Sequence, residues 1–307
     1  MSAPADTYQA HFARRWGHLR RPHVRALAWL IDAPDLLDPH DPGWHGQIAT
    51  LGAASSAVAA WLASLDADPA ALDASLGEKP YTRLGLYAEK LMAFYFAEQG
   101  RLVAHSLQVR ASRNDTIGEF DFLLDAGADG LEHIELATKF YLLQGSSAQR
   151  FDNLIGPNLA DSLGAKMRKI VGKQLALGEH PAAQALLPRP VVKAAALVKG
   201  WLFYPAASEA PLAGIGAAHC RGFWCALDEI AQRDDDAFVV LPRLQWLAPW
   251  RGAAPVLDRA GLKGELAGMP GPVLVAAVRP SGAGFEETAR GFIVPDDWRA
   301  RAAARSA

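Results

Sequence analysis

The chain has 307 residues, half of them hydrophobic, and a formal net charge of −2 at pH 7. This length suits one large domain or two modest ones. The near-neutral charge excludes a global basic field, so any nucleic-acid binding relies on a local patch. The two cysteines, Cys220 and Cys225, are too few for a disulfide framework and fit a reducing cytoplasm. Because we find no signal core and no uncharged apolar run of the roughly 18 to 20 residues that span a membrane, we expect a soluble, cytoplasmic protein without a membrane partner.

Residues 1–78 are rich in alanine and predict an α-helical N-terminal extension. Its best helical segments are HVRALAWLIDAPDLL and IATLGAASSAVAAWLASL. A further helix is predicted over 81–99, where apolar residues cover nearly the whole circumference, so that this helix is largely buried. Glu89 lies in its middle. A strand at LVAHSLQVR follows.

Two more strands are predicted in the stretch GEFDFLLDAGADGLEHIELATKFY, where acidic residues interrupt both apolar runs. Glu119 and Asp121 share one face of the first strand, and His133, Glu135 and Lys139 share one face of the second, because strand side chains alternate. Carboxylates inside apolar strands are costly to bury unless they are paired or bind a cation. Asp121 and Glu135 on adjacent strands therefore predict a site for a divalent metal that handles phosphate, Mg²⁺ or Mn²⁺. The alternative is a solvated face of the sheet.

The rest of the chain predicts a helix over 157–178, a core strand at VVKAAALVKGWLFYP and a helical segment at FWCALDEIAQ. Three further strands are predicted at FVVLPRLQWL, PVLVAAVRP and ARGFIVP. This order of elements is typical of a mixed α/β layered core. We expect a helical extension over 1–78, an α/β domain over 79–299 and a disordered tail over 300–307.

The order of a helix with Glu89, a strand, a strand with Asp121, a strand with Glu135, a helix and a strand resembles the PD-(D/E)XK nuclease superfamily. More narrowly, GEFDFLL, ELATKFYL, GPNLADSL with the QLAL after it, and KGWLFYP resemble DUF1853, a bacterial family of uncharacterised function placed in that superfamily. The resemblance implies a nuclease-like mixed sheet flanked by helices, and metal-dependent cleavage. It matches Asp121 and Glu135 to the motif acids and Glu89 to the helix acid. It also matches Gln174 to a glutamine that follows the motif in RecB-like nucleases.

The chain departs from the family's Glu-X-Lys pattern, because Ala137 occupies the lysine position and Lys139 lies two residues further on. At about 3.3 Å per residue, the Cα of Lys139 is roughly 13 Å from that of Glu135, against about 7 Å for the usual spacing. Lysine has a long flexible stem, so we expect its ammonium to lean back over the small Ala137 towards Glu135. Otherwise Lys139 is an ordinary strand-end lysine.

Two interpretations stay open for several polar residues. Glu119 is either a third ligand or a residue of the rim, and Glu89 either faces the metal or pairs with Arg83 or Arg101. His133 is interpreted as a satisfied core or edge residue. The segment HCRGFWC, with Cys220 and Cys225, is too weak a zinc pattern, and buried free cysteines are the favoured interpretation.

The predicted helix over 157–178 carries a basic stripe, defined as Lys166, Lys169 and Lys173. It is either a solvated helix face or, beside a metal site, a set of phosphate contacts. Gln174 lies on the apolar stripe of the same helix and should have a polar partner, unless it caps an orphan backbone group.

The sequence therefore favours a magnesium-dependent nuclease acting on DNA or RNA. Asp121 and Glu135 would hold the metal, Lys139 would assist, and Glu89 and Gln174 would support the site. The alternative is a nuclease-fold protein that has lost catalysis and serves as a binding or assembly module, which the displaced lysine favours.

Overall fold

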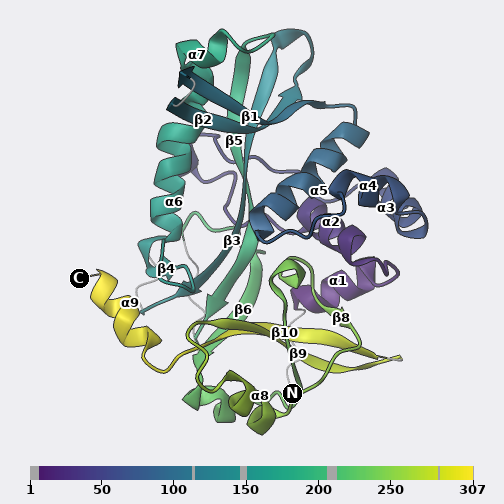
Figure 1. Cartoon of the computed structure of the whole chain (residues 1–307), viewed down its shortest axis with the longest axis vertical. Coiled ribbons are helices and arrows are strands. Elements are labelled where there is room, and N and C mark those ends of the chain that lie inside the picture. Colours follow the sequence, from purple (N-terminus) through teal and green to yellow (C-terminus); the bar gives the residue numbers. More distant parts are fainter. Residues whose placement is uncertain (1–6, 113–114, 146–150, 206–212, 283, 307) are drawn as a thin grey trace.

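A computed structural model describes residues 7–112, 115–145, 151–205, 213–282 and 284–306 of the chain. Within these ranges, ten strands form one mixed sheet, so that the expected α/β class is confirmed (Figure 1). The strands are β1 (Leu102–Ser112), β2 (Asp115–Asp125), β3 (Leu131–Leu143), β4 (Leu154–Ile155), β5 (Val191–Tyr204), β6 (Cys220–Ala226), β7 (Phe238–Val240), β8 (Arg251–Gly252), β9 (Val273–Ser281) and β10 (Gly284–Val294). Their order across the sheet is β1-β2-β3-β5-β6-β10-β9-β7, with β4 beside β3 and β8 beside β10.

Parallel pairing holds the middle of the sheet together. β3 pairs with β5 from Leu131–Val191 to Leu142–Phe203, and β5, β6 and β10 run parallel beside it. Every residue of β5 from 195 to 204 is buried, because a central parallel strand is covered on both faces and reads as a continuous apolar run. Lys199 is the one charged residue in this buried run. Its ammonium donates to the Asp35 carboxylate at 2.8 Å and to the Ala33 carbonyl at 2.6 Å.

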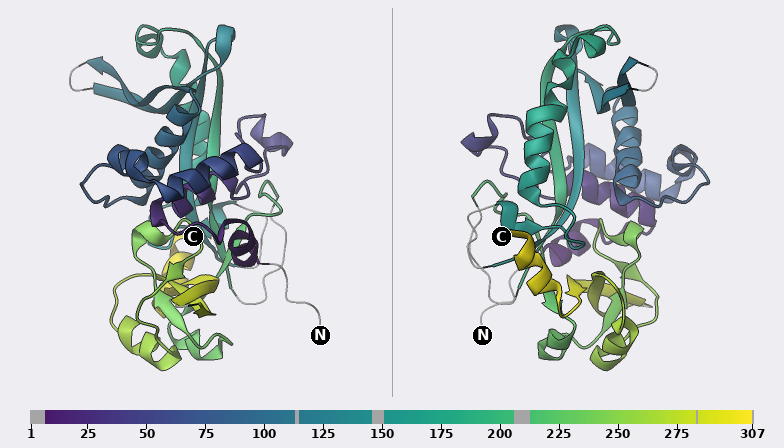
Figure 2. Two further views of the ribbon diagram at one scale, coloured as in Figure 1. Left: turned by 90° about the vertical axis from the view of Figure 1, so that its right-hand side faces the viewer. Right: turned by 60° about the vertical axis from the view of Figure 1, so that its left-hand side comes forward.

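Helices cover both faces of the sheet (Figures 1 and 2). The N-terminal group is α1 (Tyr8–Trp16), α2 (Pro22–Asp32), α3 (Ser56–Ala67), α4 (Ala70–Leu76) and α5 (Leu84–Glu98). The opposite face carries α6 (Leu163–Lys169), its π-helical continuation η4 (Ile170–Gln174), η5 (Leu175–Glu179) and α7 (Pro181–Gln184). The N-terminal helices pack into the same hydrophobic core as the sheet, where the rings of Trp29 and Trp201 stack at 6.4 Å. Among the described residues, no helix has the length and apolar character needed to cross a membrane.

The helix predicted over 157–178 begins later and is less regular than expected. A turn precedes it, in which Leu159 has a φ of 59° and donates to the Gly156 carbonyl. Ser162 then caps α6, since its hydroxyl accepts from the Ala165 N–H at 3.2 Å. The six residues before this cap therefore belong to a loop, which lies beside the site described below.

The helix predicted at IATLGAASSAVAAWLASL is wrong for residues 48–54. Ile48 forms a parallel bridge with Ala196 of β5, and α3 begins only at Ser56.

Two further predictions of local structure are wrong. The segment FWCALDEIAQ contributes strand β6 and a short 3₁₀ turn, η6 (Asp228–Gln232), because β6 fills the gap between β5 and β10. The tail expected to be disordered is instead helix α9 (Trp298–Ser306). Trp298 and Ala302 are buried, and the indole of Trp298 donates to the Pro157 carbonyl at 2.7 Å. Only residue 307 of that tail lies outside the described residues.

The strand predicted at FVVLPRLQWL is also shorter than expected. It ends with β7, and the 3₁₀ turn η7 (Arg243–Gln245) follows Pro242. Proline cannot donate to a strand ladder, and the chain leaves the sheet here. The turn and the loop after it reach back towards β3, where Trp246 packs against Phe140 with ring centroids 5.5 Å apart.

Candidate active site

The site begins where β2 and β3 separate. Backbone pairing of these strands runs from Asp125–Leu131 to Phe122–Ile134, and the next pair would be Asp121 and Glu135. There the Leu136 N–H donates to the Asp121 carboxylate at 2.9 Å. The Asp121 carboxylate therefore replaces a backbone carbonyl as the partner of this N–H group, and it lies between the two strands where their pairing ends.

A cleft of about 430 Å³ opens at this separation. Residues of α5, β2, β3, the loop before α6, the α6–η4 helix and η7 line it. Among the residues predicted for the site, those that line the cleft are Glu89, Asp121, Glu135, Lys139, Lys166 and Gln174. The remaining two, Lys169 and Lys173, are exposed on the same helix and do not line the cleft.

Glu135 is buried and held from two sides. One carboxylate oxygen lies 2.9 Å from His133 Nε2, and the other accepts from the Gln174 side-chain amide. The polar partner expected for Gln174 is thus an acid of the site rather than a backbone group. His133 is fully buried, with the edge-to-face ring of Phe120 4.7 Å away. It is a core residue as expected, but it is not fully satisfied, since its Nδ1 is buried without a hydrogen-bond partner among the described residues. The contacts with His133 and Gln174 fix the orientation of the Glu135 carboxylate.

Negative charge is crowded on this side of the cleft. Burial, Glu119 and Glu135 raise the pKa of Glu89 to about 7, against a smaller opposite effect of Lys166. Burial and the charges of Glu135 and Glu89 raise the pKa of Asp121 well above its ordinary range, although the Leu136 N–H opposes this. Desolvation and like charge both disfavour the ionised carboxylates. A bound cation would relieve this repulsion.

Basic groups lie further along β3. Burial and the charge of Lys166 lower the pKa of Lys139, whereas Asp161 opposes this effect. The structure gives Glu135 the partners His133 and Gln174, and Asp161 is the acid that acts on Lys139. The approach of Lys139 to Glu135 remains a prediction.

Asp161 was missed by the sequence reasoning. It belongs to the GPNLADSL segment, lines the cleft, and accepts from the Tyr141 hydroxyl at 3.0 Å. Its other carboxylate oxygen lies against Gly156, where a Cβ atom would come within 2.5 Å of it. The glycine therefore makes room for this acid. The resemblance of this segment to a family motif was the available signal.

The chain from 25 to 294 matches the family model described as Domain of unknown function (DUF1853). It belongs to the DUF1853 family. The matched region contains all the residues that line the cleft of this DUF1853 protein. Comparisons with curated proteins and with solved structures gave no match.

Of the two arginines considered as partners for Glu89, Arg83 lines the cleft of this DUF1853 protein, whereas Arg101 and the remaining candidates lie outside it. Glu119 accepts from Gln108 at 3.4 Å, and Arg101, considered as a partner for Glu89, pairs with Glu132 at 2.9 Å. Cys220 and Cys225 are buried free cysteines, as expected, and burial raises the pKa of both thiols.

The donor set of the cleft fits Mg²⁺ or Mn²⁺. Across the described residues, no three His, Cys, Asp or Glu side chains converge on a point where they would hold a metal alone. Mg²⁺ does not need such a cage, since it keeps several waters and is commonly held by one or two carboxylates. Asp121 and Glu135 supply two hard carboxylates, and the raised pKa of Asp121 shows that no cation among the described residues stabilises its ionised form. These two residues would hold the ion, with water and backbone oxygens as further ligands.

Metal affinity is expected to rise with pH. The ion must displace the proton of Asp121, whose pKa is raised, and its positive charge also favours loss of the proton of Glu89 nearby. Each displaced proton strengthens binding about tenfold per pH unit below its pKa. Calorimetric titration with Mn²⁺ should therefore show much tighter binding at pH 8 than at pH 6, and Asp121→Asn should flatten this dependence. An affinity independent of pH would contradict the site.

The free energy of unfolding of the metal-free protein should fall as pH rises, whereas metal affinity increases. The pKa of Glu89 is about 7 in the folded chain against an ordinary 4.5. The folded state therefore holds its proton longer than the unfolded state, and stability falls as pH rises between these two values. The increase in melting temperature on adding Mn²⁺ should accordingly be larger at the higher pH.

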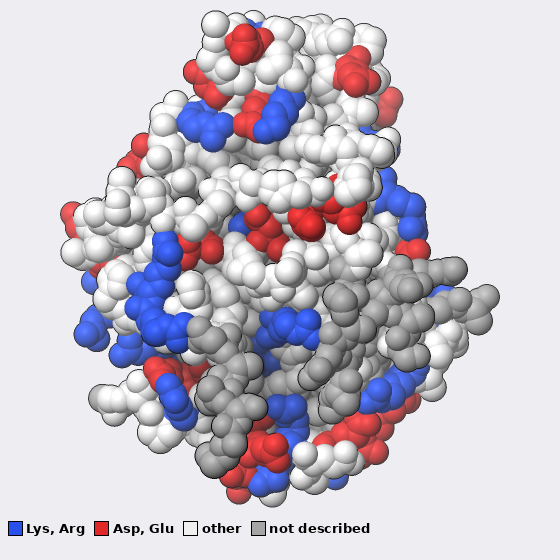
Figure 3. All heavy atoms as spheres, turned by 180° about the vertical axis from the view of Figure 1, so that it is seen from behind, with Lys and Arg blue, Asp and Glu red and all other residues white. Residues whose placement is uncertain are grey.

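Charges on the rear face of the molecule are mixed (Figure 3). Basic and acidic side chains form separate small groups among neutral ones over the part of that face that is described, and neither sign dominates, in agreement with the net charge of −2. A polyanion would therefore be attracted by local groups, and the cleft lining supplies four: Arg83, Lys139, Lys166 and Arg243.

Proposed function

We propose that this DUF1853 protein is a metal-dependent nuclease with a PD-(D/E)XK-like core, which hydrolyses phosphodiester bonds in DNA or RNA. The observation that carries the proposal is the pair Asp121 and Glu135 in one cleft, where burial and the neighbouring carboxylates raise the pKa of Asp121. The lysines and arginines that line the same cleft support it, because a phosphodiester needs cations around it.

The proposed roles follow from the contacts of each residue. Asp121 and Glu135 would hold the ion, which would supply Lewis acidity and make water a better nucleophile. His133 and Gln174 orient the Glu135 carboxylate, as outer-shell partners do in metal sites. Glu89, with a pKa of about 7, exchanges a proton readily near neutral pH.

Two lysines of the cleft would act on the phosphate. Lys139 and Lys166 both line the cleft, and Lys166 lowers the pKa of Lys139 and of Glu89. Their positive charge would stabilise the negative charge that develops on the phosphate oxygens during hydrolysis. Lys166 lowers the pKa of Glu89. It would supply, from the helix, the positive charge that the Glu-X-Lys pattern places on the strand at position 137.

The test is a cleavage assay of the full chain on single- and double-stranded DNA and RNA. Substrates would be labelled with a fluorophore, and each reaction would contain Mg²⁺, Mn²⁺ or EDTA. We expect cleavage with either metal and none with EDTA. Absence of cleavage on all four substrates, with metal binding intact, would favour the alternative, a catalytically inactive nuclease-fold module. Ala137 at the usual lysine position is the feature that favours this alternative.

The basic stripe gives a separate prediction for binding. Lys166→Gln should weaken nucleic-acid binding and lower the slope of log K against log salt by about 0.7 to 0.9, the value for one lost phosphate contact. Lys169→Gln and Lys173→Gln are matched controls on the same helix, because both side chains are exposed outside the cleft. Anisotropy titrations at several salt concentrations would measure the slopes. Equal changes of the slope in all three variants would show that Lys166 contacts phosphate no more than the two lysines outside the cleft do.

A further inference from the structure

An aromatic ring and a guanidinium form one wall of the cleft. Trp246 is half-buried and lines the cleft, and the Arg243 guanidinium lies 5.2 Å from its ring centroid. Arg243 is exposed and lines the cleft as well. Both residues come from the η7 turn and the residue after it, far in sequence from the acids. Aromatic rings and arginine planes are the surfaces on which unpaired bases stack.

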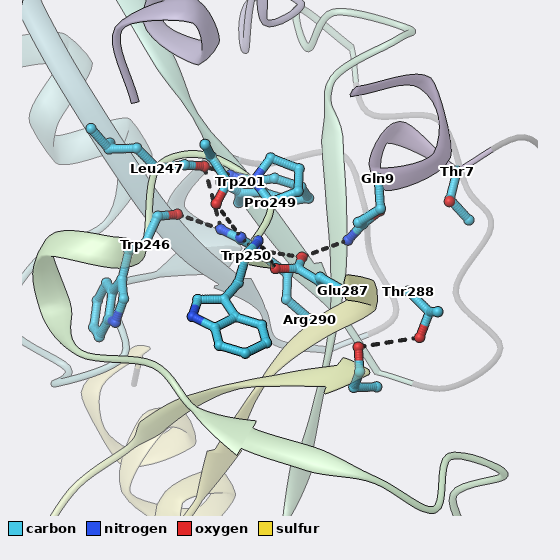
Figure 4. Close-up of polar contacts among 12 residues, drawn as sticks. Thr7, Gln9, Trp201, Trp246, Leu247, Pro249, Trp250, Glu287, Thr288 and Arg290 are labelled. Atoms are coloured by element: carbon cyan, nitrogen blue, oxygen red, sulfur yellow. Dashed lines mark hydrogen bonds and ion pairs between the residues drawn. The ribbon is translucent and has the colours of Figure 1, made fainter. Parts of the chain in front are cut away.

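The Trp246 ring is rigidly held. Its indole N–H donates to the Leu241 carbonyl at 3.0 Å, and Phe140 and Phe292 pack edge to face against it at 5.5 and 5.3 Å. Its backbone carbonyl accepts from Arg290 (Figure 4). The ring therefore loses little conformational freedom when a ligand stacks on it.

The stack lies away from the metal site. Trp246 packs on Phe140, five residues beyond Glu135 on β3, which is about 17 Å along the strand at 3.3 Å per residue. Because strand side chains alternate, Phe140 and Trp246 lie on the opposite face of β3 from Glu135. Lys139 lies between them on the same strand and lines the cleft. Both faces of β3 line the cleft, because pairing with β2 ends at Ile134 and leaves this edge of the strand open. The acids, the lysine and the aromatic ring therefore border one cleft, which suits a chain of nucleotides that crosses this edge with its phosphates near the lysine.

We propose that Trp246 and Arg243 form a base-stacking subsite that selects single-stranded nucleic acid. A base in a duplex is already stacked and paired, so it reaches this ring only from an unpaired segment. The inference rests on the proposed function for its substrate class, and it adds the strandedness and the residues that recognise it.

The test measures binding of a labelled oligo(dT) and of an abasic oligonucleotide of the same length. Titrations by fluorescence anisotropy would use the full chain carrying Asp121→Asn, so that cleavage does not interfere. Trp246→Leu keeps an apolar side chain but removes the aromatic face, and we expect it to weaken oligo(dT) binding roughly 5- to 150-fold. Binding of the abasic strand, which has phosphates but no bases, should not change. Trp61→Leu is the matched control, because Trp61 is half-buried on α3 outside the cleft.

The outcomes separate this inference from the proposed function. Equal affinity for oligo(dT) and the abasic strand, unchanged binding in Trp246→Leu, or tighter binding of the matching duplex would each overturn the subsite. The subsite would also be overturned if oligo(dT) did not bind at all. Base-dependent binding through Trp246 in a protein whose natural chain cleaves nothing would support the subsite and reject the nuclease.

Discussion

Asp121→Asn and Glu135→Gln are each expected to reduce metal-dependent cleavage by about 10²- to 10³-fold or more. Both substitutions remove a negative charge from the cleft while nearly conserving side-chain shape. In Asp121→Asn the amide oxygen still accepts from the Leu136 N–H, which the carboxylate binds at 2.9 Å in the natural chain. The loss should therefore come from metal binding rather than from folding.

Stability provides an independent measurement on the same variants. Burial and nearby carboxylates raise the pKa of Asp121, so its ionised form destabilises the metal-free protein. Asp121→Asn is expected to be at least as stable as the natural chain at pH 8 without metal, and to lose the stabilisation by Mn²⁺. If Asp121 serves function, its replacement should give a more stable but inactive protein. If Asp121 serves the fold, its replacement should lower stability.

Matched controls exist on the same two strands. Asp125 on β2 is exposed and pairs with Arg189 at 2.8 Å, and Glu132 on β3 pairs with Arg101 at 2.9 Å. Asp125→Asn and Glu132→Gln should leave cleavage within about twofold, because surface ion pairs contribute little. Full cleavage by Asp121→Asn, or an equal loss in the controls, would show that the acidic pair has no special role.

The parts of the fold that follow from local pattern were predictable from sequence. β5 reads as an unbroken apolar run and is a buried central strand, and helix 81–99 is apolar all round and is largely buried as α5. The gathering of Glu89, Asp121 and Glu135 in one cleft was expected because two of them lie on adjacent strands. Each of these inferences depends on the side-chain period of one element.

The features that escaped prediction depend on contacts between distant segments. The run FWCALDEIAQ fits a helix or a strand, and the place of β6 between β5 and β10 decides for a strand. The C-terminal helix is held by Trp298, whose partner Pro157 lies 141 positions earlier. Trp246 reaches the cleft only because the loop from 246 to 250 folds back onto the sheet. No local pattern indicates that return.

A buried ionic network holds this loop in place (Figure 4). The Arg290 side chain is fully buried, binds both carboxylate oxygens of Glu287 at 2.7 Å, and donates to the carbonyls of Trp246, Leu247 and Ala248. Arg25 binds the next carbonyl, that of Pro249, at 2.9 Å. The loop has little regular secondary structure, so these side chains replace the backbone partners that a helix or strand would give its carbonyls.

Arg290→Met is therefore expected to lower the free energy of unfolding by about 3 to 5 kcal/mol, because it leaves Glu287 as a buried charge without its cation. Urea unfolding would measure the loss. Arg279→Met on β9 is the matched control, since its ion pair with Glu286 is largely exposed and should contribute about 1 kcal/mol or less. Replacing Glu287 by Met in the Arg290→Met background should restore part of the stability, since the unpaired charge is then removed. Amide hydrogen exchange should rise around Trp246 in Arg290→Met and stay unchanged in the control. Equal stability of the two arginine variants would mean that the network does not hold the wall of the cleft.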